Sequence, residues 1–216
     1  MRCVDSMKII NKLVLTTIVV SLLTGCLGLG SKEDEGDGQQ HYYVIDVDRG
    51  AIATDFAKNR VVRIKPVQIT PYFRSQNIVF KIGDDEYQHQ QMHQFFSEPG
   101  EMITSQVERW LKKSGLFSQV VTGDSPADME LEIAVTRLYG DKREQFSPQA
   151  VLEMQFFLML DNDSNQQPLF QTGLRIDIDI EKTTAPNVVK GWRQGLEELL
   201  ATVEDDFSGY FSKRSP

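Results

Sequence analysis

The sequence has few cysteines and no large basic cluster, and each shortage excludes a class of protein. Its 216 residues contain only two cysteines, Cys3 and Cys26, both near the N-terminus. They cannot supply a disulfide framework or a cysteine-based zinc site in the rest of the chain. The formal net charge is −8. This excludes a general nucleic-acid binder and a protein held on anionic lipids by its charge.

Familiar catalytic motifs are also missing. The sequence has no GxSxG elbow, Walker A loop, GxGxxG loop or HExxH pair. His89 and His93 are four residues apart near Glu86, a spacing that on a helix could ligate zinc. The Gln-rich surroundings and the predicted strand favour a polar surface pair instead. We therefore expect no enzyme activity, no metal and no cofactor.

Two acidic segments have an ordinary structural interpretation. Residues 161–165 (DNDSN) resemble the start of a calcium loop, but Gln166 and Thr172 stand where such a loop needs Gly and Glu. They predict a hairpin turn. Asp177 and Asp179 share one strand face, where paired carboxylates could do acid–base chemistry. On an amphipathic strand they indicate the solvated side.

The N-terminal segment has the pattern of a secretory signal. Residues 13–23 form an uncharged apolar run of 11 residues, too short for a transmembrane helix of about 20 residues. Arg2, Lys8 and Lys12 precede or begin this run. We predict a signal peptide over residues 1–25, and Met7 is an alternative start.

The signal ends in a motif that resembles a bacterial lipobox, Leu23-Thr24-Gly25-Cys26. Signal peptidase would recognise the first three residues, and the Cys26 thiol would carry diacylglycerol. The freed amine would take a further acyl chain such as palmitate, because two or three chains are needed for stable anchoring. The alternative is a secreted protein with a chance cysteine.

Residues 26–40 predict the lipidated cysteine and a flexible acidic linker, because they are rich in Gly, Asp and Glu without periodicity. Leu27 follows the cysteine, where enterobacterial inner-membrane lipoproteins have Asp. This resemblance suggests a location at the periplasmic face of the outer membrane. Residues 41–216 are expected to form one domain.

Alternating periods of 2 and 3.6 residues place the elements of this domain. Ser97 and Gly115 bracket a predicted helix, and Thr184 is the expected N-cap of a second helix over residues 186–211. Residues 150–161 are apolar on both faces and predict a central strand, whereas Glu204 is expected on the outside of the second helix. Further strands are predicted at residues 42–47, 59–70, 77–81, 87–90, 117–121, 129–139 and 169–181.

The predicted fold class is α/β, a single domain with a mixed β-sheet and two main amphipathic helices packed on it. The order of the segments resembles the ABC-type transport auxiliary lipoproteins, the PqiC-like family associated with mammalian-cell-entry (MCE) lipid transport systems. The resemblance rests on the lipobox and on residues 42–47 (YYVIDV), 63–73 (RIKPVQITPYF), 77–96, 98–121 and 129–142.

This resemblance implies a non-enzymatic outer-membrane lipoprotein. Its acyl anchor would sit in outer-membrane lipid, and the domain would dock a periplasm-spanning MCE tunnel protein that has an inner-membrane partner. A homo-oligomer is compatible with this role. The alternatives are a periplasmic lipid-binding carrier, an outer-membrane biogenesis scaffold and a periplasmic hydrolase.

A docking surface is predicted at residues 87–96, because aromatic residues are enriched at interfaces. The candidate contacts there are Tyr87, His93, Phe95 and Phe96. The segment departs from the family pattern at residues 93–96, where the resemblance leads us to expect Trp before the proline.

Overall fold

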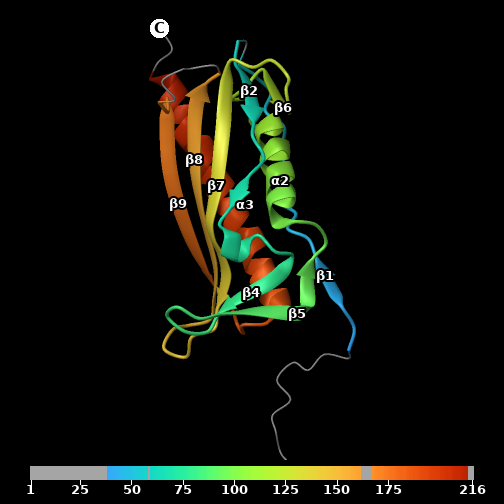
Figure 1. Ribbon diagram of the computed structural model, residues 1–216. Helices are drawn as coiled ribbons and strands as arrows, with labels where there is room; N and C mark the ends of the chain where they lie inside the picture. Colours follow the sequence, from blue (N-terminus) through green and yellow to red (C-terminus); the bar gives the residue numbers. More distant parts are fainter. Residues whose placement is uncertain (1–37, 58, 162–166, 214–216) are drawn as a thin grey trace, which may run out of the picture. The chain divides into compact units, whose positions relative to one another are not determined.

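The computed structural model describes residues 38–57, 59–161 and 167–213 (Figure 1). The signal peptide, the lipobox of Leu23, Thr24, Gly25 and Cys26, and most of the linker lie outside the described residues. So do residues 162–166 of the predicted hairpin turn. The predictions for these segments stay predictions.

Three long antiparallel strands form the main part of the sheet (Figure 1). Strand β7 (Met129–Asp141) pairs with β8 (Gln149–Leu160), which pairs with β9 (Phe170–Asp179). Apolar residues alternate with polar ones along β7 as far as Val135, so one face of the strand joins the core. A bulge between Val135 and Arg137 then reverses the alternation.

The other edge of β7 receives three short parallel strands in chain order. These are β2 (Val61–Ile64), β3 (Gln68–Ile69) and β4 (Asn77–Lys81), with the short 3-10 helix η1 (Pro71–Phe73) before β4. The single strand predicted at 59–70 is therefore wrong. Pro66 has no N–H for the ladder, and the next N–H, of Val67, donates to the Thr104 hydroxyl at 2.9 Å.

The sheet continues beyond these short strands at both ends. Strand β6 (Gln119–Thr122) pairs with β2, while β5 (Tyr87–Phe95) pairs antiparallel with β4 and parallel with β1 (His41–Tyr43). β5 is longer than predicted and β1 is shorter. β1 ends early because the backbone turns toward the first helix, where the Val47 N–H donates to Gln106 Oε1 at 3.1 Å.

Helix α2 (Pro99–Ser114) buries one apolar stripe, as its sequence period predicts. The helix starts after Glu98, and Ser97 is not its N-cap, because proline fits the first helical position. Gly115 ends it with a left-handed φ of 76°. A side chain there would collide with the Asp55 carbonyl. The buried stripe includes Met102, Ile103, Val107, Trp110 and Leu111.

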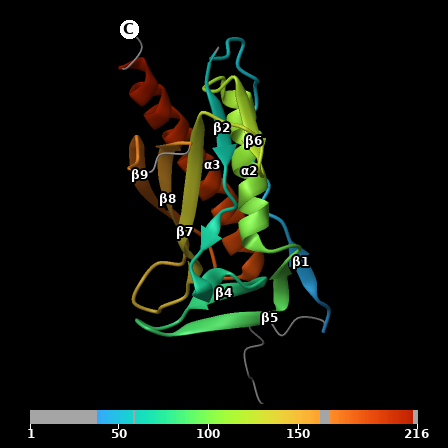
Figure 2. The ribbon, with the colours of Figure 1, turned by 45° about the horizontal axis from the view of Figure 1, so that its top comes forward.

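Helix α3 (Ala185–Ser212) begins after Thr184, as predicted, and packs against β8 and β9 (Figures 1 and 2). Gly191 permits this close approach, because a Cβ there would lie 2.5 Å from Ala150 Cβ. The buried Trp192 indole N–H donates to the Val151 carbonyl at 3.0 Å. The helix is thereby fixed to the middle of the sheet.

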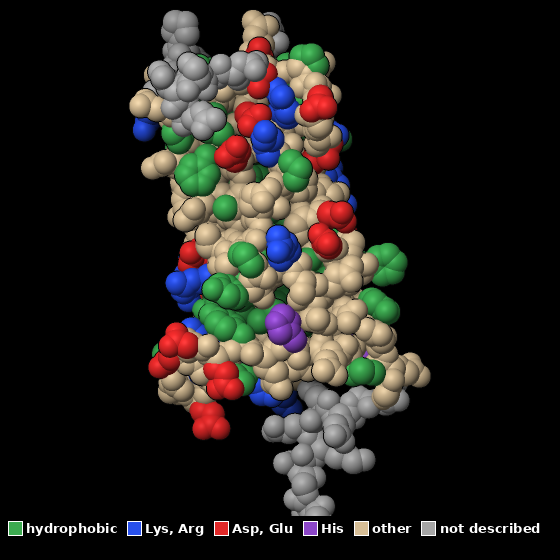
Figure 3. Space-filling model, in the orientation of Figure 1, with side chains coloured by type: hydrophobic (Ala, Val, Ile, Leu, Met, Phe, Trp, Pro, Cys, Tyr) green, Lys and Arg blue, Asp and Glu red, His purple; other side chains and the backbone are tan. Residues whose placement is uncertain are grey.

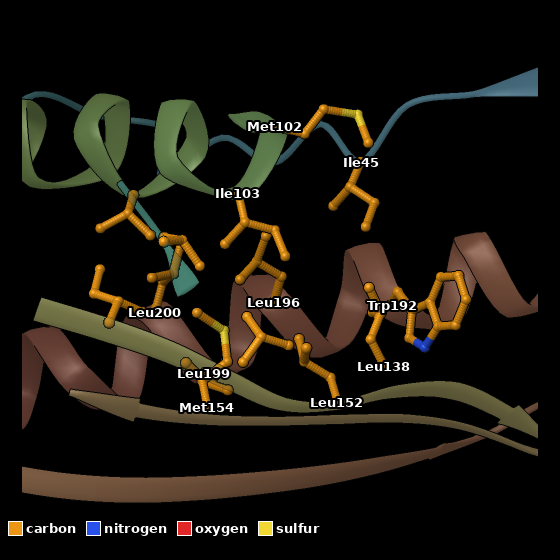
Figure 4. Close-up of a cluster of buried hydrophobic side chains, with 14 of the residues drawn as sticks. Ile45, Met102, Ile103, Leu138, Leu152, Met154, Trp192, Leu196, Leu199 and Leu200 are labelled. Carbon is orange, nitrogen blue, oxygen red and sulfur yellow. The ribbon is translucent and has the colours of Figure 1, made fainter. Parts of the chain in front are cut away.

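The core lies where α2, α3 and the sheet meet. Figure 4 shows Ile103 of α2, Leu196 of α3 and Leu152 of β8 converging in one cluster, and all three are buried. Burial of such side chains contributes about 1.5–3 kcal/mol each. The α/β single-domain prediction, with a mixed sheet and two main helices, is confirmed.

The central strand predicted at residues 150–161 is confirmed, since β8 lies between β7 and β9. Its outer face is only half-buried at Phe157 and Met159, because none of the described elements forms a second layer there. One detail of the second helix is wrong. Glu204 does not line the outside of α3. It accepts hydrogen bonds from Arg49 at 2.7 Å and from the Trp110 indole at 2.8 Å, and so joins three segments.

Candidate docking surface

The four predicted contact residues lie on or just beyond β5 but do not form one site. At about 3.4 Å per residue, the eight steps from Tyr87 to Phe95 span about 27 Å. Tyr87 and Phe96 are exposed by 38% and 72%, whereas Phe95 is 1% exposed. The expectation that Phe95 is an exposed aromatic residue is wrong. Its ring lies 5.6 Å from that of Trp192, in the core.

One exposed aromatic surface, here called the Phe96 patch, consists of Tyr42, Val44 and Phe96. Tyr42 and Val44 alternate with inward-facing residues, and both are 57% exposed. The Tyr42 ring meets the Phe96 ring edge to face at 6.2 Å. Of these residues only Phe96 was a predicted contact. The alternation in the YYVIDV segment places Tyr42 and Val44 on one face of the strand, which is the signal that could have identified them.

His93 lies on the other face of β5 and is held by its neighbours. Its ring stacks on His41 at 5.1 Å, and its Nδ1 shares a hydrogen bond of 2.8 Å with the Tyr43 hydroxyl. His89 instead contacts the Ser75 hydroxyl at 3.4 Å. In the described part of the chain, no group of three or more His, Cys, Asp or Glu side chains could hold a metal ion.

Tyr87 belongs to a second group, the Tyr87 cluster, made by Tyr72, Phe73, Tyr87 and Tyr139. The rings of Phe73, Tyr87 and Tyr139 lie 5.6–5.9 Å apart, and Lys81 Nζ lies 5.6 Å from the Tyr87 ring. Figure 3 shows hydrophobic side chains gathered at the β4–β5 end of this face, above a group of acidic side chains.

A pocket of about 580 Å³ opens over this cluster. Its walls combine aromatic rings with charged groups of both signs, so it can take a side chain with an apolar body and a polar end. Tyr139 reaches this face only because the β7 bulge reverses the alternation, which no sequence signal showed. The pocket is lined by Tyr72, Phe73, Lys81, Asp84, Tyr87 and Arg137, among others.

An ion-pair network fixes the hairpins beside this pocket. Asp141, 4% exposed, accepts hydrogen bonds from Arg143 Nε at 3.0 Å and from its terminal nitrogen at 2.7 Å. Arg143 also bonds Asp84 in the β4–β5 hairpin at 3.0 Å. Burial alone would raise the pKa of Asp141, but the Arg143 guanidinium and N–H lower that pKa below its ordinary value.

β5 differs from the rest of the chain in its lack of charged side chains. Residues 87–97 contain no Lys, Arg, Asp or Glu, although a quarter of the whole chain is charged. Charged residues are depleted at the centre of protein interfaces, whereas Tyr, Phe and Met are enriched there. Exposed aromatic rings with glutamine amides between them bind by dispersion, stacking and hydrogen bonds.

The fold is a single α/β domain with an exposed aromatic surface. The sequence of residues 43–204 matches the family of ABC-type transport auxiliary lipoprotein components, and the chain belongs to this family. Its members are auxiliary components of ABC-type transport. No curated protein matches the sequence significantly.

Two solved structures have a similar fold. Protein XCC0632 from Xanthomonas campestris is 18% identical with a TM-score of 0.68, and the match covers 81% of this chain and all of that one. An uncharacterized protein is 17% identical with a TM-score of 0.59, covering 78% and 98% of the two chains. No helix in the described ranges has both the length and the hydropathy to cross a bilayer.

Proposed function

We propose that this protein is an outer-membrane lipoprotein of an MCE-type lipid transport system, and that it docks a periplasm-spanning tunnel protein at the outer membrane. The observation that carries the proposal is the family match over residues 43–204. The lipobox, the acidic linker and the exposed aromatic surface agree with it. The tunnel protein's inner-membrane partner would belong to the same system.

The anchor in this proposal is Cys26, after cleavage behind Leu23, Thr24 and Gly25. Residues 1–25 are then removed as a signal peptide, residues 26–40 carry the acyl chains and the linker, and residues 41–216 form the domain. The 14 residues from 27 to 40 extend at most about 48 Å. The domain would therefore act close to the membrane that holds its lipid, and Leu27 favours the outer membrane.

The docking surface in this proposal is the Phe96 patch. Tyr87 and His93, the other predicted contacts, lie outside it, in the Tyr87 cluster and on the opposite face of β5. Phe96 is the most exposed large hydrophobic residue of the described chain, at 72%. It lies beside Tyr42 on a strand pair with no Lys, Arg, Asp or Glu. Phe95 takes no direct part, because its side chain is in the core. It supports the patch by holding β5 against Trp192.

A photo-crosslinking residue at Phe96, placed in the full chain in intact cells, tests this surface. The expected product is a covalent adduct with an MCE-domain protein. The matched control carries the same group at Ile52, which is 64% exposed, and should give no such adduct. An adduct with a β-barrel assembly protein instead would favour the biogenesis scaffold. Stoichiometric lipid in the purified domain would favour the carrier.

A further inference from the structure

Strand β9 forms one margin of the sheet (Figure 1). Its ten residues pair in unbroken register with β8, and within the described ranges β9 pairs with no other strand. The outer edge of such a strand presents unpaired N–H and C=O groups, which readily pair with another chain. No proline and no bulge interrupts this edge.

The inner face of β9 is apolar but incompletely covered. Leu174, Ile176 and Ile178 pack against the core, yet each stays half-buried, whereas the matching residues of β8 are buried. A further strand beside β9 would cover the exposed part of this row. The edge therefore has both free backbone groups and apolar side chains to bury.

The outer face carries a row of alternating charge that ends at this edge. Arg137 of β7 lies opposite Glu153 of β8, and Glu153 lies opposite Arg175 of β9. Arg137 Nε is 3.2 Å from Glu153 Oε2. Opposite charges on neighbouring strands stabilise a sheet and like charges destabilise it. Within one chain Arg175 pairs with Asp177 of the same strand at 2.8 Å, and the two side chains stay 39% and 33% exposed. An acidic residue opposite Arg175 on an added strand would extend the alternating row beyond this pair.

We propose that β9 pairs antiparallel with β9 of a second copy of this chain, about a two-fold axis at Ile176. Arg175 then faces Asp177 of the other copy, twice by symmetry, and continues the alternating row. Leu174 faces Ile178 of the second copy, and Ile176 faces itself. Asp179 faces Gly173, so no like charges oppose each other.

A parallel, in-register arrangement does not fit this edge. It would place Arg175 opposite Arg175 and Asp177 opposite Asp177, which repel. The antiparallel pair is self-complementary, as an isologous two-fold interface must be. This inference goes beyond the proposed function and does not depend on the tunnel protein.

Single cysteines in the full chain, oxidised in intact cells, test the register. Ile176→Cys places two thiols across the two-fold axis, and a disulfide-linked dimer is expected. The control Thr172→Cys lies on the same strand face, but its two copies are eight residue steps apart, about 27 Å. Thr172→Cys should give no disulfide-linked dimer. The unchanged chain, oxidised in the same way, gives the background level of dimer.

Charge variants on the exposed face provide a second measurement. With Ile176→Cys present, Arg175→Asp or Asp177→Arg alone should lower the dimer yield about tenfold, because each places like charges opposite one another twice. Co-expression of these two variants, or both changes in one chain, should restore it. Circular dichroism checks that each variant folds.

Three results would overturn the proposal. Equal dimer yields at positions 172 and 176 would show a parallel or unspecific contact. Folded variants that stay monomeric would show that β9 does not pair with itself. An adduct of Ile176→Cys with a different protein would show that the edge receives a partner's strand.

Discussion

Asp141 shows how one buried carboxylate holds the surface around the Tyr87 cluster. It bonds Arg143, and Arg143 in turn bonds Asp84 of the β4–β5 hairpin. We expect Asp141→Asn to lower the free energy of unfolding by about 2 kcal/mol at pH 7, because it removes the buried charge that the half-buried Arg143 guanidinium pairs with. Urea unfolding measures this. The control Asp84→Asn, on a side chain 81% exposed, should change it by less than about 0.5 kcal/mol.

The pH dependence of this effect follows from the lowered pKa of Asp141. The folded state releases the proton more readily than the unfolded state, whose carboxyl has its ordinary pKa near 3.8. The stabilisation is therefore complete above about pH 4 and is lost as the pH falls through the folded pKa. The difference in the free energy of unfolding between the unchanged chain and Asp141→Asn should therefore shrink as the pH falls below about 4. A constant gap down to pH 2 would contradict the assignment.

Two glycines of α3 face the sheet, and only Gly191 lies too close to it for a side chain. A Cβ at Gly191 would lie 2.5 Å from Ala150 Cβ, whereas one at Gly195 would meet nothing closer than 3.4 Å. We expect Gly191→Ala to lower the free energy of unfolding by about 1–3 kcal/mol, because the added methyl group overpacks the contact with β8. Gly195→Ala should raise it by up to about 1 kcal/mol through helix propensity. Equal effects in thermal unfolding would contradict this packing.

Periodicity predicted most of the elements correctly where the pattern is long. The apolar stripes of α2 and α3 and the alternation along β7 and β9 follow directly from side-chain geometry. Pro66 favoured an edge position or a bulge within the strand predicted at residues 59–70, but the chain instead forms two separate strands on either side of it. The bulge in β7 had no sequence signal, because Thr136 and Arg137 have no conformational preference that marks an extra residue. Its consequence, that the buried Tyr139 ring packs against Phe73 and Tyr87 on the face of β7 opposite Val135, could not be predicted.

That residues 87–96 carry a docking surface stays a prediction, but the structure corrects which of their side chains are exposed. The prediction rested on the aromatic residues and glutamines of this segment. Exposure along a strand depends on which face meets the core, and this separates Phe95 from Phe96. Tyr42 joins Phe96 only through the parallel pairing of β1 with β5, a long-range contact that local patterns do not contain.

At the scale of the whole protein, the proposed role needs three parts: a lipid anchor, a linker and a domain that binds a partner. The domain and its family are shown by the fold and by the match over residues 43–204. In the proposed role the anchor determines where this domain acts, because the acyl chains would hold the domain at a membrane. Cys26 is therefore the residue on which the proposed role depends.

The mass of the N-terminal peptide of the native protein tests this central claim most directly. The account predicts that the mature chain starts at Cys26 and carries diacylglycerol on its sulfur and an acyl chain on its amine. Mass spectrometry after extraction of the membranes with detergent would show these additions. A chain that retains residues 1–25, or one that starts at Cys26 with an unmodified thiol, would contradict the account.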